Sequence, residues 1–468
     1  MIFNSYIFIL LFLPISIITY FVLTRTTKPP VSDWWLVFVS LIFYSFAKRD
    51  AIIFIFASLV VNYLFCTFIG KKRNSLSRIL LAVSVVLNLC ALFVLRFIRF
   101  DSIIVPLGIS FITFEQIAYV VETYKGNTEG FSLSEYLLYV LWFPKISQGP
   151  LANPVKFVSS LRDDSRRKVN YDNIADGLFC ISIGLFKKMF IADSISKYVD
   201  AGYMLLDYLG TASSLVVILG YTLQIYMDFS GYCDIAYGVS KMFNITLPVN
   251  FNSPYKAESV TEFWKRWHIS LTDFLREYVY FPLGGSKKGK ARTYINILLV
   301  FIVSGIWHGN TINFILWGLL HGVCQVIERA GKNVFSRINH YVKVFVTFVI
   351  VNIGWVLFRA PNLQSFLMVL RGVFRKTEYG SNFAVFMADT TIANSTIVSK
   401  LGLLGNIISD YFSVFVLTAG LIICFLFPNL YSRKRKNSLF NSVLCAVLLL
   451  ISILSMSGAI TRFIYFNF

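Results

Sequence analysis

Charged side chains are scarce in this sequence. Asp, Glu, Lys and Arg make up 14% of its 468 residues, whereas a soluble domain carries about 25%. Hydrophobic residues make up 56%, and the mean hydropathy is +0.67. This composition excludes an ordinary soluble fold. It also argues against a nucleic-acid-binding protein, because no soluble basic domain exists to hold the nucleic acid.

Cysteine and histidine are also rare. The seven cysteines are scattered, mostly inside apolar runs, and no CxxC pair occurs. The sequence therefore predicts neither a disulfide framework nor a metal site, and we interpret the cysteines as small core residues. Only four histidines exist, His268, His308, His321 and His340, and three of them fall in one polar-rich zone.

Long apolar runs are what the sequence has in abundance. A helix that crosses a bilayer needs ~20 consecutive apolar residues, and such runs predict an all-α, polytopic membrane protein with roughly 11 spans and a few re-entrant or interfacial helices around a central tunnel. Met1–Leu23 is expected to be the first span and not a cleavable signal, since a basic n-region is missing. The runs are Ile2–Leu23, Trp34–Ala47, Ile52–Ile69, Ile79–Phe97, Ile103–Val121, Leu133–Phe143, Gly177–Phe190, Leu215–Met227, Ile295–Ile306, Ile312–Val326, Val342–Phe358, Tyr411–Phe427 and Leu439–Leu454.

The net charge of +19 is concentrated in short loops. Loops of this kind follow the positive-inside rule and contact anionic lipid headgroups. The alternative interpretation is that some of them bind an anionic donor such as a coenzyme A thioester. The candidate donor-binding residues lie directly after the His268 segment: Lys287, Lys288, Lys290 and Arg292. The Arg433–Lys436 run is expected to be cytoplasmic, which would place the C-terminus, one span later, outside.

We expect a single domain, residues 1–468. Its parts are N-terminal spans (1–100), a catalytic core (101–360), a surface loop (361–410), and C-terminal spans with an aromatic tail (411–468). Transporters commonly show two-fold hydropathy symmetry, and this sequence shows no internal repeat. From Gln224 to His321, polar and aromatic residues crowd into helical stretches, which is costly in a membrane unless they pair or line a cavity.

The richest stretch runs from Ser259 to His268. Ser259 and Glu262 fit a capping box, and Glu262 and Arg266 are spaced to pair. We predict an interfacial or re-entrant helix that continues to about Tyr280 and stops at Pro282. In such a helix Trp264 and His268 would share a face, and Trp267 would lie beside them.

His308 ends an apolar helix, directly after Trp307. An ionisable group at that depth is expensive and is functional by default. Histidine, with an ordinary pKa close to neutral, is a natural base for deprotonating a hydroxyl acceptor. The alternative is a hydrogen-bonded structural histidine, which is less favoured for His308, open for His268, and favoured for His321.

Gln224, Asp228 and Gly231 fall on one face of a predicted helix. A carboxylate within an apolar run needs a partner. Two interpretations remain open and equally weighted: a polar wall of a reaction tunnel, or polar packing between helices, with Gly231 and Gly238 permitting close approach.

Taken in order, the motifs resemble the membrane-bound O-acyltransferase family. The resemblance is to its bacterial branch, which serves alginate, cellulose and peptidoglycan O-acetylation and teichoic acid D-alanylation. The matching pieces are Pro106–Phe111, Gln148–Pro150, Gly184–Lys188, Gln224–Tyr232, Asn250–Tyr255, Thr261–Ser270, Tyr280–Gly285, Gly305–Gly309, Trp317-Gly318 with His321-Gly322, and Gly354–Ala360.

The resemblance implies a bowl-shaped helical fold pierced by a tunnel, in a bacterial cytoplasmic membrane. It implies that His308 is the family's catalytic histidine and that His268 occupies its second polar catalytic position. Acetyl-CoA is the expected donor substrate, with no permanently bound cofactor and no metal. The expected partner is an extracytoplasmic serine-esterase-like (SGNH-type) acetyltransferase, which finishes the transfer to the polysaccharide. D-alanyl or lipid O-acyl transfer is the alternative, and a transporter is less favoured.

The chain end, Phe463–Phe468, also resembles the aromatic tail of these acetyltransferases. Its one hydroxyl belongs to Tyr465, and a phenyl ester passes its acyl group on readily. We therefore expect Tyr465 to act as a covalent relay. An interfacial aromatic anchor is the alternative.

Overall fold

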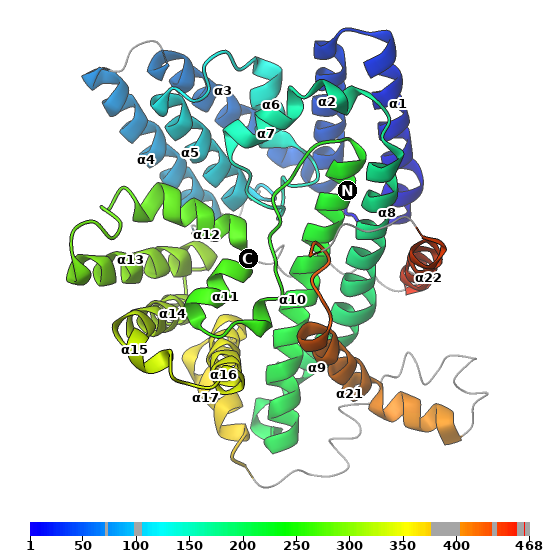
Figure 1. The fold of residues 1–468 in the computed structure, drawn as a ribbon, viewed down its shortest axis with the longest axis vertical. Coiled ribbons are helices and arrows are strands. Elements are labelled where there is room, and N and C mark those ends of the chain that lie inside the picture. The colour runs from blue at the N-terminus through cyan, green and yellow to red at the C-terminus, as the bar shows by residue number, and fades with distance from the viewer. Residues whose placement is uncertain (71–73, 98–104, 376–402, 433–437, 456–462, 464–468) are drawn as a thin grey trace. The chain divides into compact units, whose positions relative to one another are not determined.

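The computed structural model describes residues 1–70, 74–97, 105–375, 403–432, 438–455 and 463 (Figure 1). Within these ranges every regular element is a helix. The predicted all-α class is therefore confirmed. The candidate relay residue Tyr465, most of the predicted 361–410 surface loop and the Arg433–Lys436 run lie outside the described residues.

Six helices in the described part are long and apolar enough to cross a membrane: Phe8–Thr26, Ile52–Ile69, Ser75–Arg96, Thr211–Met242, Lys290–His308 and His340–Arg359. Three shorter apolar helices accompany them, Pro30–Phe46, Val414–Leu426 and Leu439–Ser455. The sequence predicted roughly 11 spans. Among the described residues only six helices have the length and apolar composition that a span requires, so the prediction is not reached there. Some of the apolar runs counted toward it form short helices, such as α6 (Leu133–Leu141).

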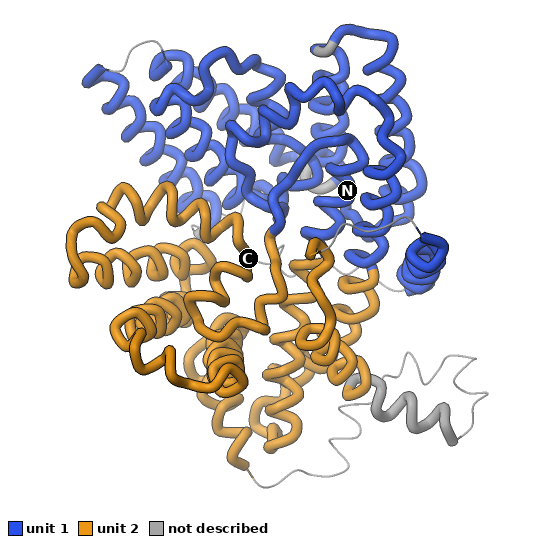
Figure 2. Tube along the Cα trace, in the orientation of Figure 1, with its two compact units in different colours: residues 1–185, 232–249, 434–467 blue, residues 186–231, 250–433, 468 orange. Residues whose placement is uncertain are grey.

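The chain divides into two compact units (Figure 2). Unit 1 comprises residues 1–185, 232–249 and 434–467. Its helices are η1 (Phe8–Phe12), α1 (Leu13–Thr26), α2 (Pro29–Lys48), η2 (Arg49–Ala51), α3 (Ile52–Ile69), α4 (Ser75–Phe97), α5 (Ile109–Lys125), α6, α7 (Pro154–Leu161), η3 (Asp164–Arg167), α8 (Tyr171–Leu185), the second part of α10 (Thr211–Met242) and α22 (Leu439–Ser455).

Inside unit 1, glycine lets α8 and α10 approach closely. A Cβ added at Gly177 would lie 2.6 Å from the backbone oxygen of Gly238, and one at Gly238 would lie 2.5 Å from the oxygen of Gly177. Any side chain at either position would force the two backbones apart. The close approach at Gly238 that the packing interpretation requires is present.

Unit 2 comprises residues 186–231, 250–433 and 468. Its helices are η4 (Phe186–Ala192), α9 (Asp193–Met204), η5 (Leu206–Tyr208), the first part of α10, η6 (Pro254–Lys256), α11 (Val260–Arg266), α12 (Ile269–Leu275), η7 (Arg276–Tyr280), α13 (Lys290–His308), α14 (Ile312–Ala330), α15 (Lys332–Phe335), α16 (His340–Arg359), α17 (Leu363–Gly372) and α21 (Leu403–Leu426). With the exception of Tyr465, every candidate site residue belongs to this unit.

Helices α13 and α14 form a tight antiparallel hairpin. A Cβ at Gly305 would meet the backbone oxygen of Phe314 at 2.3 Å, and one at Gly318 would meet the oxygen of Phe301 at 2.2 Å. Further along, Gly322 faces Leu298. This register is antiparallel, so the last turn of α14 lies beside the first turn of α13.

Candidate functional site

The helix predicted from Ser259 to Tyr280 is interrupted at Trp267 and His268. Trp267 ends α11 with φ −107° and ψ 129°, and His268 takes the left-handed region at φ 45° before α12 begins. The break lets the Ile269 amide donate to the backbone oxygen of Asn250, at 3.0 Å. The prediction of one continuous helix is therefore wrong, and Trp264 and His268 do not share a helical face.

The break also fixes the imidazole of His268. Its Nδ1 lies 3.3 Å from Oδ1 of Asn250, and that oxygen accepts from the amide and hydroxyl of Ser270 at 3.0 and 2.9 Å. Because the amide oxygen only accepts, Nδ1 must carry the hydrogen. In the neutral ring, Nε2 is then the nitrogen that can take up a proton. The geometry gives His268 the orientation that proton transfer requires.

His308 is the last residue of α13, as predicted, and it is buried. Its ring lies edge-to-face against three aromatic rings, with centroids 4.7 Å from Trp307, 5.0 Å from Trp317 and 5.0 Å from Phe358. Gly305, one turn earlier, allows α14 to pass close to this end of α13. The imidazole is thus held by packing at the turn between the two helices.

His321 lies on α14, one turn after Trp317, and is fully buried. Its ring centroid is 5.3 Å from Trp264 and 5.2 Å from Trp317. Neither ring nitrogen has a hydrogen-bond partner among the described residues. Since an unpaired buried polar group is costly, this arrangement does not fit the satisfied structural histidine that the sequence favoured.

Four tryptophans pack against one another around the three histidines. We call Trp264, Trp267, Trp317 and Trp355 the aromatic cluster. Ring centroids are 5.5 Å apart for Trp264 and Trp317, 4.7 Å for Trp267 and Trp355, and 6.4 Å for Trp317 and Trp355. His308 and His321 both contact Trp317, and His268 directly follows Trp267. The cluster provides a dry environment, in which a charge that develops during a reaction is weakly screened.

Asp228 has the partner that the sequence required. Its Oδ1 accepts from Nζ of Lys188 at 2.6 Å, and Lys188 also binds Asp193 at 2.8 Å. Nearby on α10, Gln224 keeps Oε1 buried without a hydrogen-bond partner in the described part of the chain. The Asp228 pair has the character of polar packing, while Gln224 retains an unused acceptor. The choice between the two interpretations stays open.

The start of α11 is capped from two directions. The Ser259 hydroxyl accepts from the Glu262 amide at 3.0 Å, as predicted, whereas the Glu262 carboxylate accepts from the amide of Glu258 and not from that of Ser259. Glu262 also pairs with Arg266 at 2.7 Å, as expected. In addition, the carboxylate of Glu328 accepts from the amides of Val260 and Thr261, at 2.5 and 2.9 Å.

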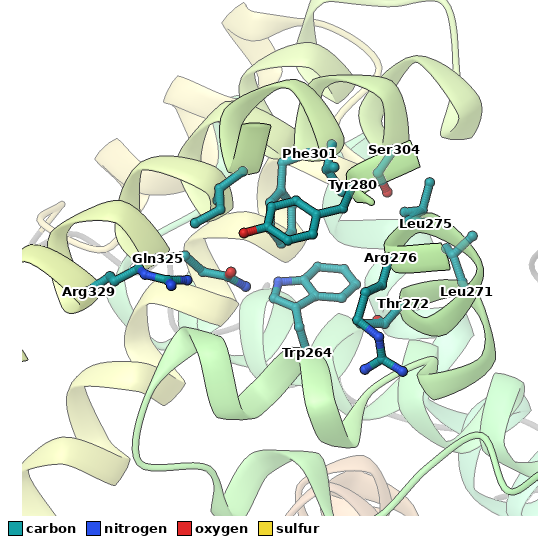
Figure 3. Close-up of a pocket in the computed structure, with 12 residues that line it drawn as sticks. Trp264, Leu271, Thr272, Leu275, Arg276, Tyr280, Phe301, Ser304, Gln325 and Arg329 are labelled. Carbon is teal, nitrogen blue, oxygen red and sulfur yellow. The ribbon is translucent and has the colours of Figure 1, made fainter. Parts of the chain in front are cut away.

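A half-open hollow lies beside the aromatic cluster (Figure 3), and the space inside it, open solvent included, is about 770 Å³. The residues that line it are Trp264, Leu271, Thr272, Leu275, Arg276, Tyr280, Ile297, Val300, Phe301, Ser304, Gln325 and Arg329. Figure 3 shows Gln325 and Arg329 on one side of the Trp264 indole and Arg276 on the other. Across the described residues no cluster of three His, Cys, Asp or Glu side chains is placed to hold a metal ion.

The basic residues Lys287, Lys288, Lys290 and Arg292 are exposed, before and within the first turn of α13. They are not among the residues that line the cavity. Their role in donor binding stays a prediction. So does the role of Tyr465.

Sequence reasoning missed several residues of this region. Asn250, Trp317, Trp355 and Phe358 all stand in the motifs that carried the family resemblance, so the signal was present although no role was assigned. Arg276, Gln325 and Arg329 stand in no such motif. Only the fold shows that they share a cavity.

Comparison with known proteins shows the family to which the chain belongs. Residues 9–370 match the family described as MBOAT, membrane-bound O-acyltransferase family. Over its whole length the chain is 34% identical to the peptidoglycan O-acetyltransferase of Helicobacter pylori, of which the match covers 98%. It is 35% identical over 78% of its length to the probable alginate O-acetylase AlgI of Pseudomonas aeruginosa, with 73% of that protein covered.

A more distant match is the teichoic acid D-alanyltransferase of Bacillus subtilis, 32% identical over 46% of this chain and 57% of that protein. The family match over residues 9–370 includes the motifs around His268 and His308. This chain belongs to the membrane-bound O-acyltransferase family and is a multi-pass membrane O-acyltransferase.

Proposed function

We propose that the protein moves an acetyl group from cytoplasmic acetyl-CoA across the cell membrane, toward O-acetylation of an extracellular polysaccharide. Peptidoglycan is the first candidate polymer, because the similarity to a peptidoglycan O-acetyltransferase extends over the full chain. An exopolysaccharide of the alginate type is the next. The observation that carries the proposal is the position of His308, buried in aromatic rings one helical turn from Ser304 in the wall of the cavity.

The proposed chemistry needs one general base. The imidazole of His308 takes the proton of an acceptor hydroxyl, whose oxygen attacks the thioester carbonyl carbon. A carbon–oxygen bond forms, the carbon–sulfur bond breaks, and the leaving thiolate receives the proton. General base catalysis of this kind typically contributes ~10²–10⁴ in rate. His268, oriented by Asn250, either shares the proton transfer or positions the donor.

The acceptor in this proposal is the phenol of Tyr465. It becomes an acetyl ester, and its acetyl group then passes to a serine of an extracytoplasmic SGNH-type partner, which modifies the polymer. This route places the protein in the bacterial cytoplasmic membrane with its aromatic tail toward the outside. The exposed basic loop at Lys287–Arg292 is proposed to face the cytoplasm and attract the anionic donor.

Ester analysis of cells that lack the gene tests the polymer assignment. Purified cell walls and secreted polysaccharide are treated with mild base, and released acetate and D-alanine are quantified. Loss of wall acetate that is restored by the wild-type gene supports peptidoglycan acetylation. Loss of acetate only from secreted polysaccharide selects the exopolysaccharide. Loss of D-alanine with unchanged acetate would contradict the proposal and favour D-alanyl transfer, which the Bacillus subtilis relative represents.

A further inference from the structure

Phe463 is fully buried against Tyr232 of α10. The two ring centroids are 5.0 Å apart and the ring planes meet at 88°, which is an edge-to-face arrangement. Tyr232 also contacts Phe3, with ring centroids 5.0 Å apart, and all three side chains are at most 1% exposed. Phe463 stands two residues before Tyr465, the proposed acyl acceptor. The part of the chain that precedes this acceptor therefore contacts unit 1 at a defined point.

The hydroxyl of Tyr232 fixes its ring in this position. It lies 2.6 Å from the hydroxyl of Ser147 and donates to the backbone oxygen of Pro144 at 3.3 Å. Both partners belong to the turn segment 143–149, between α6 and α7. Because the ring is held at its hydroxyl end, its apolar body presents an ordered surface to Phe463.

A buried ion pair holds the turn segment in turn. Lys145 is 1% exposed, and its ammonium donates to the carboxylate of Glu115 on α5 and to the backbone oxygen of Tyr139. Loss of either partner would leave an uncompensated buried charge, which is strongly destabilising. The segment that supports Tyr232 therefore has one favoured position.

Gln148, in the same segment, has polar groups that the fold does not satisfy. It directly follows Ser147 and is 1% exposed, and neither its Oε1 nor its Nε2 has a hydrogen-bond partner among the described residues. A buried amide without partners is costly. Its carboxamide offers an acceptor and two donors, which match the N–H and C=O that peptide units carry. The backbone of a chain that passes beside the segment would satisfy it.

We propose that this region of unit 1 is a docking site for the aromatic tail. Tyr232 and Ser147 seat the ring of Phe463, and the Gln148 carboxamide binds backbone groups of the tail next to that ring. An ordered water is the competing partner of Gln148. The inference rests on the proposed role of Tyr465 as acyl acceptor, and it adds the residues that position this acceptor.

The docking site limits where the acceptor hydroxyl can go. At most about 7 Å of extended chain separates the Cα atoms of residues 463 and 465. A fixed Phe463 thus confines the phenol of Tyr465 to a small volume. Confinement of a reacting group raises its effective concentration, and a small misplacement lowers the rate steeply. Tyr232 and Gln148 are therefore positioning residues in this proposal.

Photo-crosslinking in the full chain tests the docking separately from activity. The photoreactive residue p-benzoyl-phenylalanine replaces Phe463 in one protein and Phe440, an exposed residue of α22, in the control. After illumination, cross-linked peptides are identified by mass spectrometry. We expect the probe at position 463 to attach to peptides that contain Tyr232 or residues 143–149, and the control probe not to attach to them. If the probe at position 463 attached only to lipid or to other parts of the chain, the docking site would be wrong.

Phe463→Ala and Gln148→Leu test what the docking site does. Each variant keeps Tyr465 and His308, and each should lower polymer acetylation about tenfold or more at a matched amount in the membrane. Gln148→Leu also separates tail binding from a structural role. An apolar side chain of similar size removes the unpaired amide, so the melting temperature should stay or rise while acetylation falls. Phe463→Leu serves if Phe463→Ala is unstable, and Phe440→Ala is the control with wild-type acetylation.

The outcomes distinguish the docking site from the relay. Wild-type acetylation by Phe463→Ala would overturn the docking site, and the relay would stand without it if Tyr465→Phe were inactive in the same assay. Wild-type acetylation by both variants would reject the relay as well. Wild-type acetylation by Gln148→Leu would overturn tail binding by its carboxamide and leave an ordered water as its partner.

Discussion

The imidazole of His308 stands edge-on to the indole of Trp317, with ring centroids 5.0 Å apart and ring planes at 83°. Trp317 also touches His321 and Trp264. One indole thus packs against the candidate base, a second buried histidine, and Trp264 in the wall of the cavity. Packing of this kind restricts the ring to one orientation, which catalysis by a positioned base requires.

Replacement of Trp317 should therefore impair both stability and turnover. Trp317→Ala empties a buried site and should cost about 3–5 kcal/mol of stability. Trp317→Phe keeps an aromatic ring against His308 and should cost much less. Thermal unfolding and wall acetate are measured on both variants. Equal acetate from Trp317→Ala and the wild type would show that the indole does not hold His308.

Asn250 should affect acetylation through His268, and its Oδ1 also accepts from the amide and hydroxyl of Ser270. Asn250→Ala removes the acceptor of the Nδ1 hydrogen and frees the wrong tautomer, so acetylation should fall about 10–100-fold. In a double-mutant cycle, Asn250→Ala should add little to the loss caused by His268→Ala, because the two residues share one interaction. Additive losses would separate the two residues. An inactive His268→Ala variant would indicate that His268 takes part in proton transfer. A milder loss of activity would indicate that it positions the donor.

Glu328 should anchor the segment that carries Trp264. Its carboxylate sits at the start of α11 and accepts from two backbone amides and the Thr261 hydroxyl. Glu328→Ala should lower stability by about 1–2 kcal/mol, since it removes a cap and a charge at a helix N-terminus. Glu258→Ala, which removes an exposed carboxylate that contacts His340 and Lys343, is the control. Equal melting temperatures for the two variants would argue against this role.

Tyr465→Phe tests the proposed relay. The variant keeps the aromatic ring and removes only the hydroxyl, so an anchoring role would be preserved. The relay predicts loss of polymer acetylation with normal membrane insertion, and no acetyl mark on the tail peptide in mass spectra. Wild-type acetylation in this variant would eliminate the relay and leave direct transfer to the acceptor.

The sequence could predict those features of the fold that depend on residues close together in the chain. Apolar runs gave the helical class, and spacing along one helix gave the Ser259 cap and the Glu262–Arg266 pair. Each of these depends on residues within one or two turns.

What failed depends on distant residues. The segment Thr261–Leu275 has a helical sequence pattern throughout. Its helix is interrupted at His268 because Asn250, 18 positions earlier, accepts hydrogen bonds through its backbone and side-chain oxygens. Lys188 is 40 positions from Asp228. The residues that line the cavity come from five helices, α11, α12, η7, α13 and α14. Spacing along one segment carries no information about these encounters.

The most direct test of the central claim is polymer acetylation by His308→Ala, with the amount of variant in the membrane matched to the wild type by immunoblot. If His308 is the base, base-releasable acetate should fall by about 10²–10⁴-fold, while coenzyme A still binds the purified variant. Near-normal acetate in cells that carry only His308→Ala would contradict the account.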